Sequence, residues 1–400
     1  MAKSRIEIID VLRGFTLLGI AMIHFSDQYY AGEHPASHPN FTSHFLGDDI
    51  AMGFLGIFVS GKFFMIFSFL FGLSFFLQSD SGTTGTKFTL RFLWRLTLLL
   101  AIGMIHHLHY RGDILTIYAM LGVGLVVAYK LPDRALLIVA LVLTLDVPAA
   151  IQRGIEAWQL PQSTINDQFK TKPADHEEYY QIAKTGTYPE LLKANFYELE
   201  FKYRYQVQSG RIYITMGLFL LGLYAGRKRF FENLEGNLPW IRKILLKRSL
   251  WGLLALILSA AVFFGGVQIL KLPMPELLQW AIGGLFYDAA NLAMACVYVA
   301  GIIVLFGKDR WRKRLMVFYE PGRMGLTTYL MQTAVGVLLF FGIGLGWLGD
   351  VGALASLCIG IVLFGIQIYL SKWWLSKFSY GPVEWLWRRG TLLKIQAMGK

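Results

Sequence analysis

Charged residues are scarce in this chain of 400 residues, at 16% of the total. Soluble globular domains carry roughly 25% charged residues. Hydrophobic residues make up 55%, and the mean hydropathy is +0.48. This balance excludes an ordinary soluble domain. It predicts a chain that crosses a membrane several times, and the helix length of the apolar runs predicts an all-α protein.

Cysteine is also scarce. The two cysteines, Cys296 and Cys358, both lie inside apolar runs, so no extracellular disulfide framework is expected. A cleavable signal peptide is not expected either, because Arg13 interrupts the first apolar run and no small-residue cleavage site follows it. We therefore expect the first helix to be retained.

The net charge of +12 is the one feature that could suggest nucleic acid. Its distribution argues against that partner, because most of the 38 Lys and Arg residues fall in alternate loops between apolar runs. This pattern is typical of loops that stay in the cytoplasm. We predict a multi-pass protein of the cytoplasmic (inner) membrane with both termini in the cytoplasm.

The apolar runs predict a polytopic helix bundle of about ten transmembrane helices. They fall near residues 10–30, 63–78, 92–109, 113–130, 135–152, 211–227, 249–270, 277–306, 324–345 and 352–373. Residues 50–61 are too short to span and are expected in the interface. We expect one membrane domain in three parts: residues 1–152 with five helices, an extracytoplasmic segment 153–210, and residues 211–400 with five helices.

Two ionisable residues lie on the first predicted helix. Arg13 and His24 are eleven positions apart, which places them on nearly one helix face and about 16 Å apart along the axis. An ionisable side chain inside a membrane span costs roughly 2.5–3.5 kcal/mol, so this pair predicts a polar track facing the protein interior. The alternative is an arginine that reaches the headgroups and a histidine bonded to a neighbouring helix. Asp10 lies three residues before Arg13 and is placed to pair with it.

The predicted outer side carries further candidates. Residues 103–115 hold three histidines, an arginine and an aspartate in a tight turn. Asp113 begins the next helix, where a carboxylate also serves as a cap, and His106 lies one turn inside the membrane. Lys62 stands at the outer end of another helix. The histidines of the first outer loop match no standard ligand spacing, so no metal site is predicted.

Five stretches resemble the bacterial membrane family called domain of unknown function 418. They are Leu12-Arg13-Gly14-Phe15 with the rest of the first helix, Gly322-Arg323-Met324 through Thr327, Tyr329 and Gln332, the run Gly381-Pro382-Val383-Glu384-Trp385-Leu386-Trp387-Arg388, the segment Gly61-Lys62-Phe63 through Phe71-Gly72, and Gly112-Asp113-Ile114-Leu115 through Tyr118-Ala119. The resemblance spans nearly the whole chain, but this family name implies no activity.

A second, more distant resemblance does imply an activity. Arg13, ten intervening residues and His24 resemble the first-helix signature of membrane acyltransferases that acylate envelope sugars. The spacing of Asp10, Arg13 and Gly14 is similar to that of heparan-alpha-glucosaminide N-acetyltransferase-type proteins. Such a resemblance implies a bundle of ten or eleven helices that takes an acyl group from cytoplasmic acyl-CoA and delivers it across the membrane.

The chemistry of acyl transfer assigns roles to these residues. Acyl-CoA, the expected co-substrate, carries phosphates that need cations on the cytoplasmic face, and Arg13 and Arg323 lie there. Acceptor activation needs a base and a donor for the oxyanion. His24 is the first candidate, either as a base or as a covalent acyl carrier.

His106 is the second candidate for the base, with Lys62 and Asp113 as orienting or stabilising groups. No permanently bound cofactor is expected. The expected partners are membrane lipids, acyl-CoA and an acceptor that is an envelope glycan, a lipid or a small molecule; the chain is compatible with a homo-oligomer.

Two other classes remain open. In a transporter or exporter, Arg13 and His24 would line a solute or proton path with Asp288 and Asn291, which lie three apart near mid-membrane. No internal repeat supports that class. A membrane scaffold protein would account for the aromatic and basic surfaces but not for histidines inside the membrane.

Overall fold

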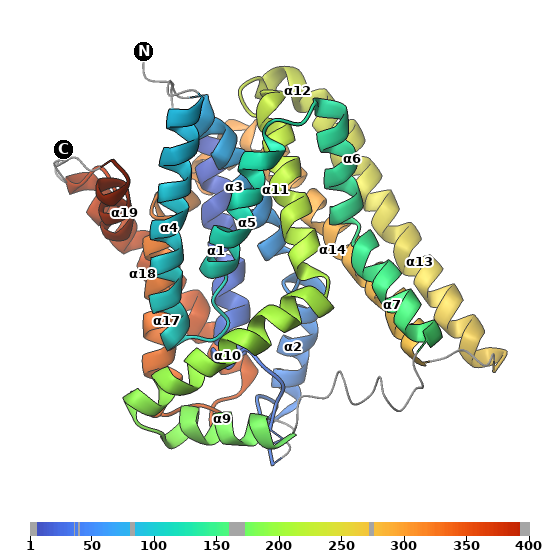
Figure 1. Ribbon diagram of the computed structural model, residues 1–400, viewed down its shortest axis with the longest axis vertical. Coiled ribbons are helices and arrows are strands. Elements are labelled where there is room, and N and C mark those ends of the chain that lie inside the picture. Colours follow the sequence, from blue (N-terminus) through green and yellow to red (C-terminus); the bar gives the residue numbers. More distant parts are fainter. Residues whose placement is uncertain are drawn as a thin grey trace.

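The computed structural model describes residues 6–392, apart from residues 36, 39–40, 81–84, 160–172 and 272–275. The extreme termini, which the charge pattern places in the cytoplasm, lie outside these ranges. Every element in the described part is a helix or a helical turn (Figure 1). They are α1 (Glu7–Ser26), α2 (Leu46–Phe58), α3 (Phe63–Ser79), α4 (Thr86–His109), α5 (Leu115–Ala128), α6 (Asp133–Thr144), α7 (Val147–Gln159), α9 (Pro173–Thr185), α10 (Tyr188–Gln208), α11 (Arg211–Arg227), α12 (Leu234–Trp240), η1 (Ile241–Leu246), α13 (Lys247–Ile269), α14 (Glu276–Phe306), α15 (Asp309–Leu315), η2 (Met316–Phe318), α16 (Tyr319–Arg323), α17 (Gly325–Phe340), α18 (Ala353–Lys377) and α19 (Pro382–Leu392).

The predicted all-α membrane bundle is confirmed. Six helical segments in the described residues are long and apolar enough to cross a membrane, or seven if α6 and α7, which are bent by 45°, count as one. Nine of the ten predicted ranges each coincide with one helix, and the range 135–152 covers parts of α6 and α7. Of the nine, α5 and α17 have only 14 and 16 residues, fewer than the roughly 20 that a full span needs. The number of spans and the side of each terminus therefore stay predictions.

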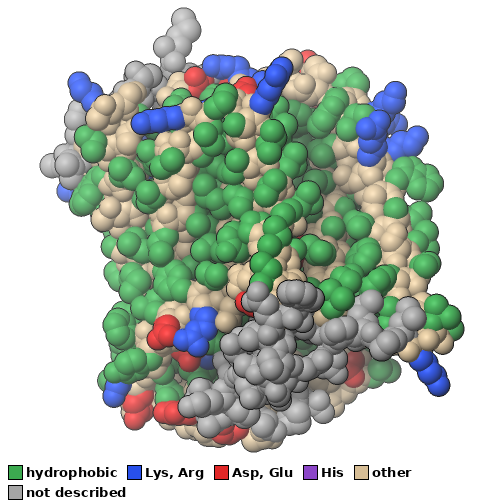
Figure 2. All heavy atoms as spheres, turned by 45° about the vertical axis from the view of Figure 1, so that its right-hand side comes forward, with side chains coloured by type: hydrophobic (Ala, Val, Ile, Leu, Met, Phe, Trp, Pro, Cys, Tyr) green, Lys and Arg blue, Asp and Glu red, His purple; other side chains and the backbone are tan. Residues whose placement is uncertain are grey.

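Hydrophobic side chains form a broad band around the middle of the molecule on the face shown in Figure 2, with charged side chains toward the two ends. Many large apolar residues are exposed, among them Val262 and Ile269 of α13 and Val362 of α18. An exposed apolar belt of this extent is unfavourable in water but matches the hydrocarbon core of a bilayer.

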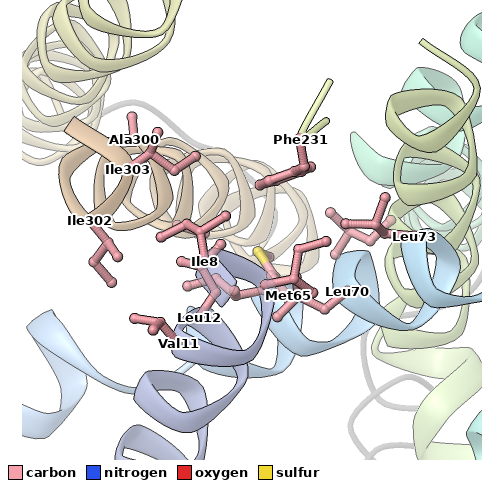
Figure 3. Packing of buried hydrophobic residues seen from close by; sticks show 14 of the residues in the cluster. Ile8, Val11, Leu12, Met65, Leu70, Leu73, Phe231, Ala300, Ile302 and Ile303 are labelled. Carbon is pink, nitrogen blue, oxygen red and sulfur yellow. The ribbon is translucent and has the colours of Figure 1, made fainter. Parts of the chain in front are cut away.

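The largest buried cluster joins the first helix to helices far along the chain. Ile8, Val11 and Leu12 of α1 pack with residues of α3 and with Ile302 and Ile303 of α14 (Figure 3). The contacting side chains come from segments nearly three hundred residues apart, so the two predicted halves of the bundle share one core.

Two predicted segments differ from the structure. The helix predicted over 135–152 is broken at Asp146, which has φ 54° and forms an ion pair with Arg153 of α7. The segment predicted to lie in the interface, residues 50–61, is mostly α2, which continues after a short turn at Gly61 (φ 82°) into α3. Together α2 and α3 form one apolar segment, Leu46–Ser79, that counts as a candidate span.

The helix predicted near residues 189–208 is confirmed as α10. With α9 it covers the end of the bundle opposite to α12 and α19 (Figure 1). Asn195 of α10 is buried and donates to the carbonyl oxygen of Leu108 (2.9 Å), and its own carbonyl oxygen bonds Nε2 of His107 (2.7 Å). The predicted outer segment is thus packed against α4.

A very close backbone contact holds α1 against residues 318–323. A Cβ atom at Gly14 would lie 1.9 Å from the carbonyl oxygen of Phe318, and one at Gly322 would lie 1.8 Å from that of Asp10. Only glycine allows two backbones to approach this closely. The contact places Arg13 and Arg323, which adjoin these glycines, at the same end of the bundle.

Substituting either glycine should therefore weaken the fold. We expect Gly14→Ala and Gly322→Ala each to lower the free energy of unfolding by about 1–3 kcal/mol, because the added methyl group meets backbone atoms. Thermal unfolding of the purified protein in detergent measures this as a lower apparent Tm. Gly301→Ala of α14 is the matched control, because no atom lies within 4 Å of the added Cβ. Equal Tm values for all three variants would contradict the packing described.

Candidate functional site

A cavity of about 1450 Å³ runs inside the bundle. Pockets for drug-sized ligands are typically about 300–1,000 Å³, so this volume accommodates a larger molecule or two substrates. Its walls come from α1, α3, α4, α5, α7, α10, α11, α13, α14, α16, α17 and α19. It therefore joins the end of the bundle that holds α19 to the end covered by α10.

One face of α3 forms an apolar wall of the cavity. Phe64, Phe67, Phe71, Ser74 and Gln78 line it and retain some exposure although α3 lies inside the bundle. Their spacing of three and four residues is that of one helix face. From Phe64 to Ser74 the wall extends about 15 Å.

The facing wall is α1, and it carries the predicted Arg13/His24 track. Both side chains line the cavity, with Ile20 and Ile23 between them. The prediction that this face of α1 points to the protein interior is thus supported by the lining residues. Arg13 lies at the end near α19 and His24 at the end near α10.

Arg13 is largely engaged in the structure. Its guanidinium forms an ion pair with Asp10 at 2.6 Å and donates to the hydroxyl oxygen of Ser74 at 2.5 Å. The pairing expected from the spacing of Asp10 and Arg13 therefore forms, and much of the charge on Arg13 is neutralised within the protein.

Arg323 lines the same end of the cavity. It donates one hydrogen bond, to the carbonyl oxygen of Ser379 at 3.2 Å, and its Nε is buried without a partner in the described residues. A second cation there, Arg95 of α4, was not predicted as a site residue. Arg95 stacks on the ring of Trp387 at 3.8 Å and has no acidic partner among the residues that the structure describes.

Three of the stretches that carry the family resemblance meet at this end. Glu384 of α19 accepts hydrogen bonds from the amides of Leu326 and Thr327 at 2.7 and 3.0 Å and from the Thr327 hydroxyl at 2.5 Å. A carboxylate at the amino end of α17 satisfies free N–H groups and favours the helix dipole. The Gly14/Gly322 contact adds the first stretch, so these residues build one wall.

His24 lies at the other end of the cavity among aromatic rings. The centroids of Tyr110, Tyr29 and Tyr329 lie 5.4, 5.5 and 6.2 Å from that of His24. The Nδ1 atom of His24 is buried and has no hydrogen-bond partner within the described part of the chain. The residue lines the cavity and keeps one ring nitrogen without a bond in the described residues.

His106, the second candidate, is occupied. Its Nδ1 lies 2.7 Å from the Asp113 carboxylate and its Nε2 lies 2.9 Å from the hydroxyl of Thr333. Because a carboxylate only accepts, Nδ1 donates the hydrogen bond to Asp113. His106 contacts Tyr329 (centroids 5.0 Å apart) but does not line the cavity in the described structure.

Asp113 is the centre of a buried polar network and also lines the cavity. It caps α5 as predicted, accepting from the amides of Leu115 and Thr116 at 3.0 Å, and its carboxylate lies 3.3 Å from Nζ of Lys202. Burial favours the neutral acid, but the hydrogen bond with His106 and the ammonium of Lys202 hold the pKa of Asp113 well below its usual range. Asp113 is thus a stabilising anion.

Lys62 is not brought to the cavity wall in the described residues. Its side chain is buried, and Nζ donates to the carbonyl oxygen of Gly56 at 3.0 Å. This bond ties the start of α3 to the last turns of α2, which accounts for a lysine at this depth.

Sequence reasoning missed several residues that line the cavity. Besides Arg95 they include Asp27, Lys202 and Arg211. Burial raises the pKa of Asp27 to about 7, although the Ala31 amide and Arg111 oppose the shift. The only sequence signal for Arg95 was its position inside an apolar helix, which the charge pattern had assigned to topology. Within the described residues, no group of three or more His, Cys, Asp or Glu is arranged to hold a metal ion.

The Asp113 network yields a stability prediction. Asp113→Asn removes the charge that His106 and Lys202 face, and breaking a buried pair costs about 3–5 kcal/mol. Since the folded pKa is lowered, the contribution of Asp113 is present above its unfolded pKa near 3.9 and declines as the pH falls below that value.

Thermal unfolding of the variant at neutral pH measures the cost. Asp133→Asn is the control, because Asp133 also begins a helix but is exposed and pairs with Arg227 and Lys228 at the surface, where such pairs contribute about 0–1 kcal/mol. If both variants shifted the Tm equally, the buried network would not have the stabilising role given to it here.

Comparison with known proteins gives a family match over part of the chain. Residues 225–394 match the family model described as "Protein of unknown function (DUF418)". No solved structure matches the chain. Curated relatives include the "Uncharacterized protein YxaH" of Bacillus subtilis (strain 168), 28% identical over 100% of this chain and 97% of the relative.

Two further relatives also match nearly end to end. The "Uncharacterized 39.9 kDa protein in amylase 3'region" of Bacillus acidopullulyticus is 26% identical over 97% of this chain and 94% of its own length. The "Uncharacterized protein YeiB" of Escherichia coli (strain K12) is 25% identical over 96% and 95%. None of these descriptions states an activity, so the similarity to acyltransferases stays a prediction. The resemblance to the first family is confirmed over residues 225–394, where this multi-pass helical membrane protein matches the DUF418 family model.

Proposed function

We propose that the protein is an acyltransferase of the cytoplasmic membrane that moves an acyl group from cytoplasmic acyl-CoA to an acceptor on the outer side. The observation that supports this most is the cavity itself. It joins a cationic end, with Arg95 and Arg323, to a histidine with a free ring nitrogen at the other end.

The cationic end would hold the nucleotide part of the donor. Phosphate groups are bound best by arginine, whose planar fork donates two parallel hydrogen bonds. Arg95 and Arg323 have no acidic partner in the described residues, whereas Arg13 is paired with Asp10. Arg95 and Arg323 would therefore bind the donor phosphates, a role predicted from the sequence for Arg13 and Arg323. Arg13 would be a neighbour held in place by Asp10.

The distance between the two ends suits an extended donor arm. Arg13 and His24 are about 16 Å apart along α1, and the Phe64–Ser74 face of α3 runs beside them. A chain lying on this wall would gain dispersion contacts with phenylalanine rings. Its thioester would then reach the level of His24.

At that level His24 acts as a base or as an acyl carrier. As a base it would take the proton of the attacking acceptor at Nδ1, a step typically worth about 10²–10⁴ in rate. The hydroxyl of Tyr329, which also lines the cavity, would donate to the oxyanion of the tetrahedral intermediate. His106 packs against Tyr329 and acts as a positioning residue, as does Asp113.

One observation also favours a transporter. Asp288 and Asn291 of α14 line the cavity together with Arg13 and His24, so polar groups from two helices face it, as in a solute path. The two functions differ in one requirement, because only the acyltransferase needs to bind acyl-CoA.

Donor binding is therefore the test. Purified protein in nanodiscs should bind acetyl-CoA or a longer acyl-CoA saturably in calorimetry. Arg95→Gln and Arg323→Gln should each weaken binding about tenfold or more, because a hydrogen bond to a charged group contributes about 1.5–3 kcal/mol. Arg204→Gln is the control, since Arg204 is exposed and pairs only with Glu200 on α10.

The role of His24 is tested separately. His24→Ala should keep donor binding but lose transfer of radiolabelled acyl groups in membranes that contain the protein. The matched variant His109→Ala, at an exposed histidine of α4, should retain it. Absence of acyl-CoA binding up to millimolar concentration would overturn the proposal and lead to flux assays in liposomes.

A further inference from the structure

Two opposite charges face the outer part of the cavity without partners. Arg211 begins α11 and Asp288 lies on α14, and both line the cavity. Neither makes a hydrogen bond or an ion pair in the part of the chain that the structure describes. Arg211 makes a cation–π contact, with its guanidinium 4.5 Å from the centre of the Phe64 ring.

This arrangement is unusual for a membrane protein. Charges at this depth are costly and are normally paired with each other or with backbone groups. Asp288 lies within electrostatic range of Arg153 and Arg211 without contacting either. Arg153 is engaged by Asp146 and the carbonyl oxygen of Ser209, so it is not a free partner. Arg211 and Asp288 therefore both line the cavity without forming an ion pair with each other.

A third unpartnered group lies beside them. Asn291 is three residues from Asp288, hence on the same face of α14, and its Nδ2 is buried without a hydrogen-bond partner in the described residues. The turn at Gly61 approaches it so closely that a Cβ there would lie 2.5 Å from Nδ2. Arg211 is also within electrostatic range of His24.

We infer that this part of the cavity binds a zwitterion, with an anionic group at Arg211 and Asn291 and an ammonium group at Asp288. A ligand with one charge would leave the opposite residue unpaired, whereas a zwitterion neutralises both. A neutral sugar would leave both unpaired. The inference rests on the proposed function for its reaction, because it makes the ammonium nitrogen the acyl acceptor.

The reaction balances with the groups present. One proton of the ammonium passes to Nδ1 of His24, and the nitrogen lone pair forms a C–N bond to the thioester carbon. The C–S bond breaks, and a second proton from that nitrogen ends on the departing thiolate. The products are an amide and the thiol of CoA, and His24 returns its proton to water.

Binding is measured without any acyl donor, so that this test is independent of the acyltransferase test. The probes are glycine, β-alanine, γ-aminobutyrate, 6-aminohexanoate and phosphoethanolamine, which vary the separation and type of the charges. At least one should raise the apparent Tm of the purified protein saturably. Ethylamine and acetate, each with a single charge, should not do so at the same concentration.

A lipid headgroup carries the same chemistry as a free zwitterion, and a second arm separates the two sources. The protein is compared in nanodiscs of phosphatidylethanolamine and of phosphatidylglycerol. Stabilisation by phosphatidylethanolamine alone would identify the ligand as a lipid headgroup. Stabilisation by the soluble probes would identify it as a small molecule.

Variants connect binding to the site. Asp288→Asn and Arg211→Gln should each weaken binding of the zwitterionic probe about tenfold or more. The two substitutions remove no contact that the structure describes apart from that of Arg211 with Phe64. Arg204→Gln should leave it unchanged. Retained binding in Asp288→Asn, or no stabilisation of the wild type in either arm, would overturn the inference.

The two proposals fail separately. Acyl transfer to a neutral acceptor with no response to any zwitterion would overturn the zwitterion site and leave the acyltransferase in place. Zwitterion binding without acyl-CoA binding would overturn the acyltransferase and leave the zwitterion site in place.

Discussion

The contact between α1 and residues 318–323 is the constraint on which the cavity depends. Where Gly14 and Gly322 meet, the backbones are too close for any side chain. Without a hydrophobic driving force between helices in lipid, such close packing is a main source of association. The contact fixes the depth of Arg13 and the placement of Arg323, so the cationic end of the cavity follows from two glycines that carry no chemistry of their own.

The opposite end is fixed by polar bonds instead. Asp113 draws His106, Lys202 and two backbone amides into one buried network, and Lys202 connects α10 to it. A fully bonded network of this kind is rigid, whereas a partly bonded one is costly. The cavity is thus stabilised at one end by close backbone packing and at the other by the ion pairs and hydrogen bonds of Asp113. The phenylalanine wall of α3 lies between these ends.

Sequence patterns were sufficient for what depends on local periodicity. Apolar runs of helix length gave the class of fold, and the eleven-residue spacing on α1 placed Arg13 and His24 on the interior face. The Asp10–Arg13 pair and the cap formed by Asp113 also follow from spacing alone. Features that depend on a partner helix could not be predicted from the sequence. The break at Asp146 depends on the surrounding Arg153 and α11. Arg211 was counted among the loop charges, because its place on the cavity wall with Asp288 depends on the packing of α11 and α14.

Satisfaction of hydrogen bonds separates the structural residues from the functional ones more sharply than residue type does. His106 and Lys62 were attractive as histidine and lysine inside a membrane, yet each has its polar atoms bonded within the protein. His24, Arg211 and Asp288 have polar groups without partners in the described residues, and all three face one cavity. Since unpaired polar groups are expensive in a membrane, a fold that keeps three of them around one space has a use for a polar ligand there. That argument holds for both the enzyme and the transporter, and it is the acyl donor alone that distinguishes them.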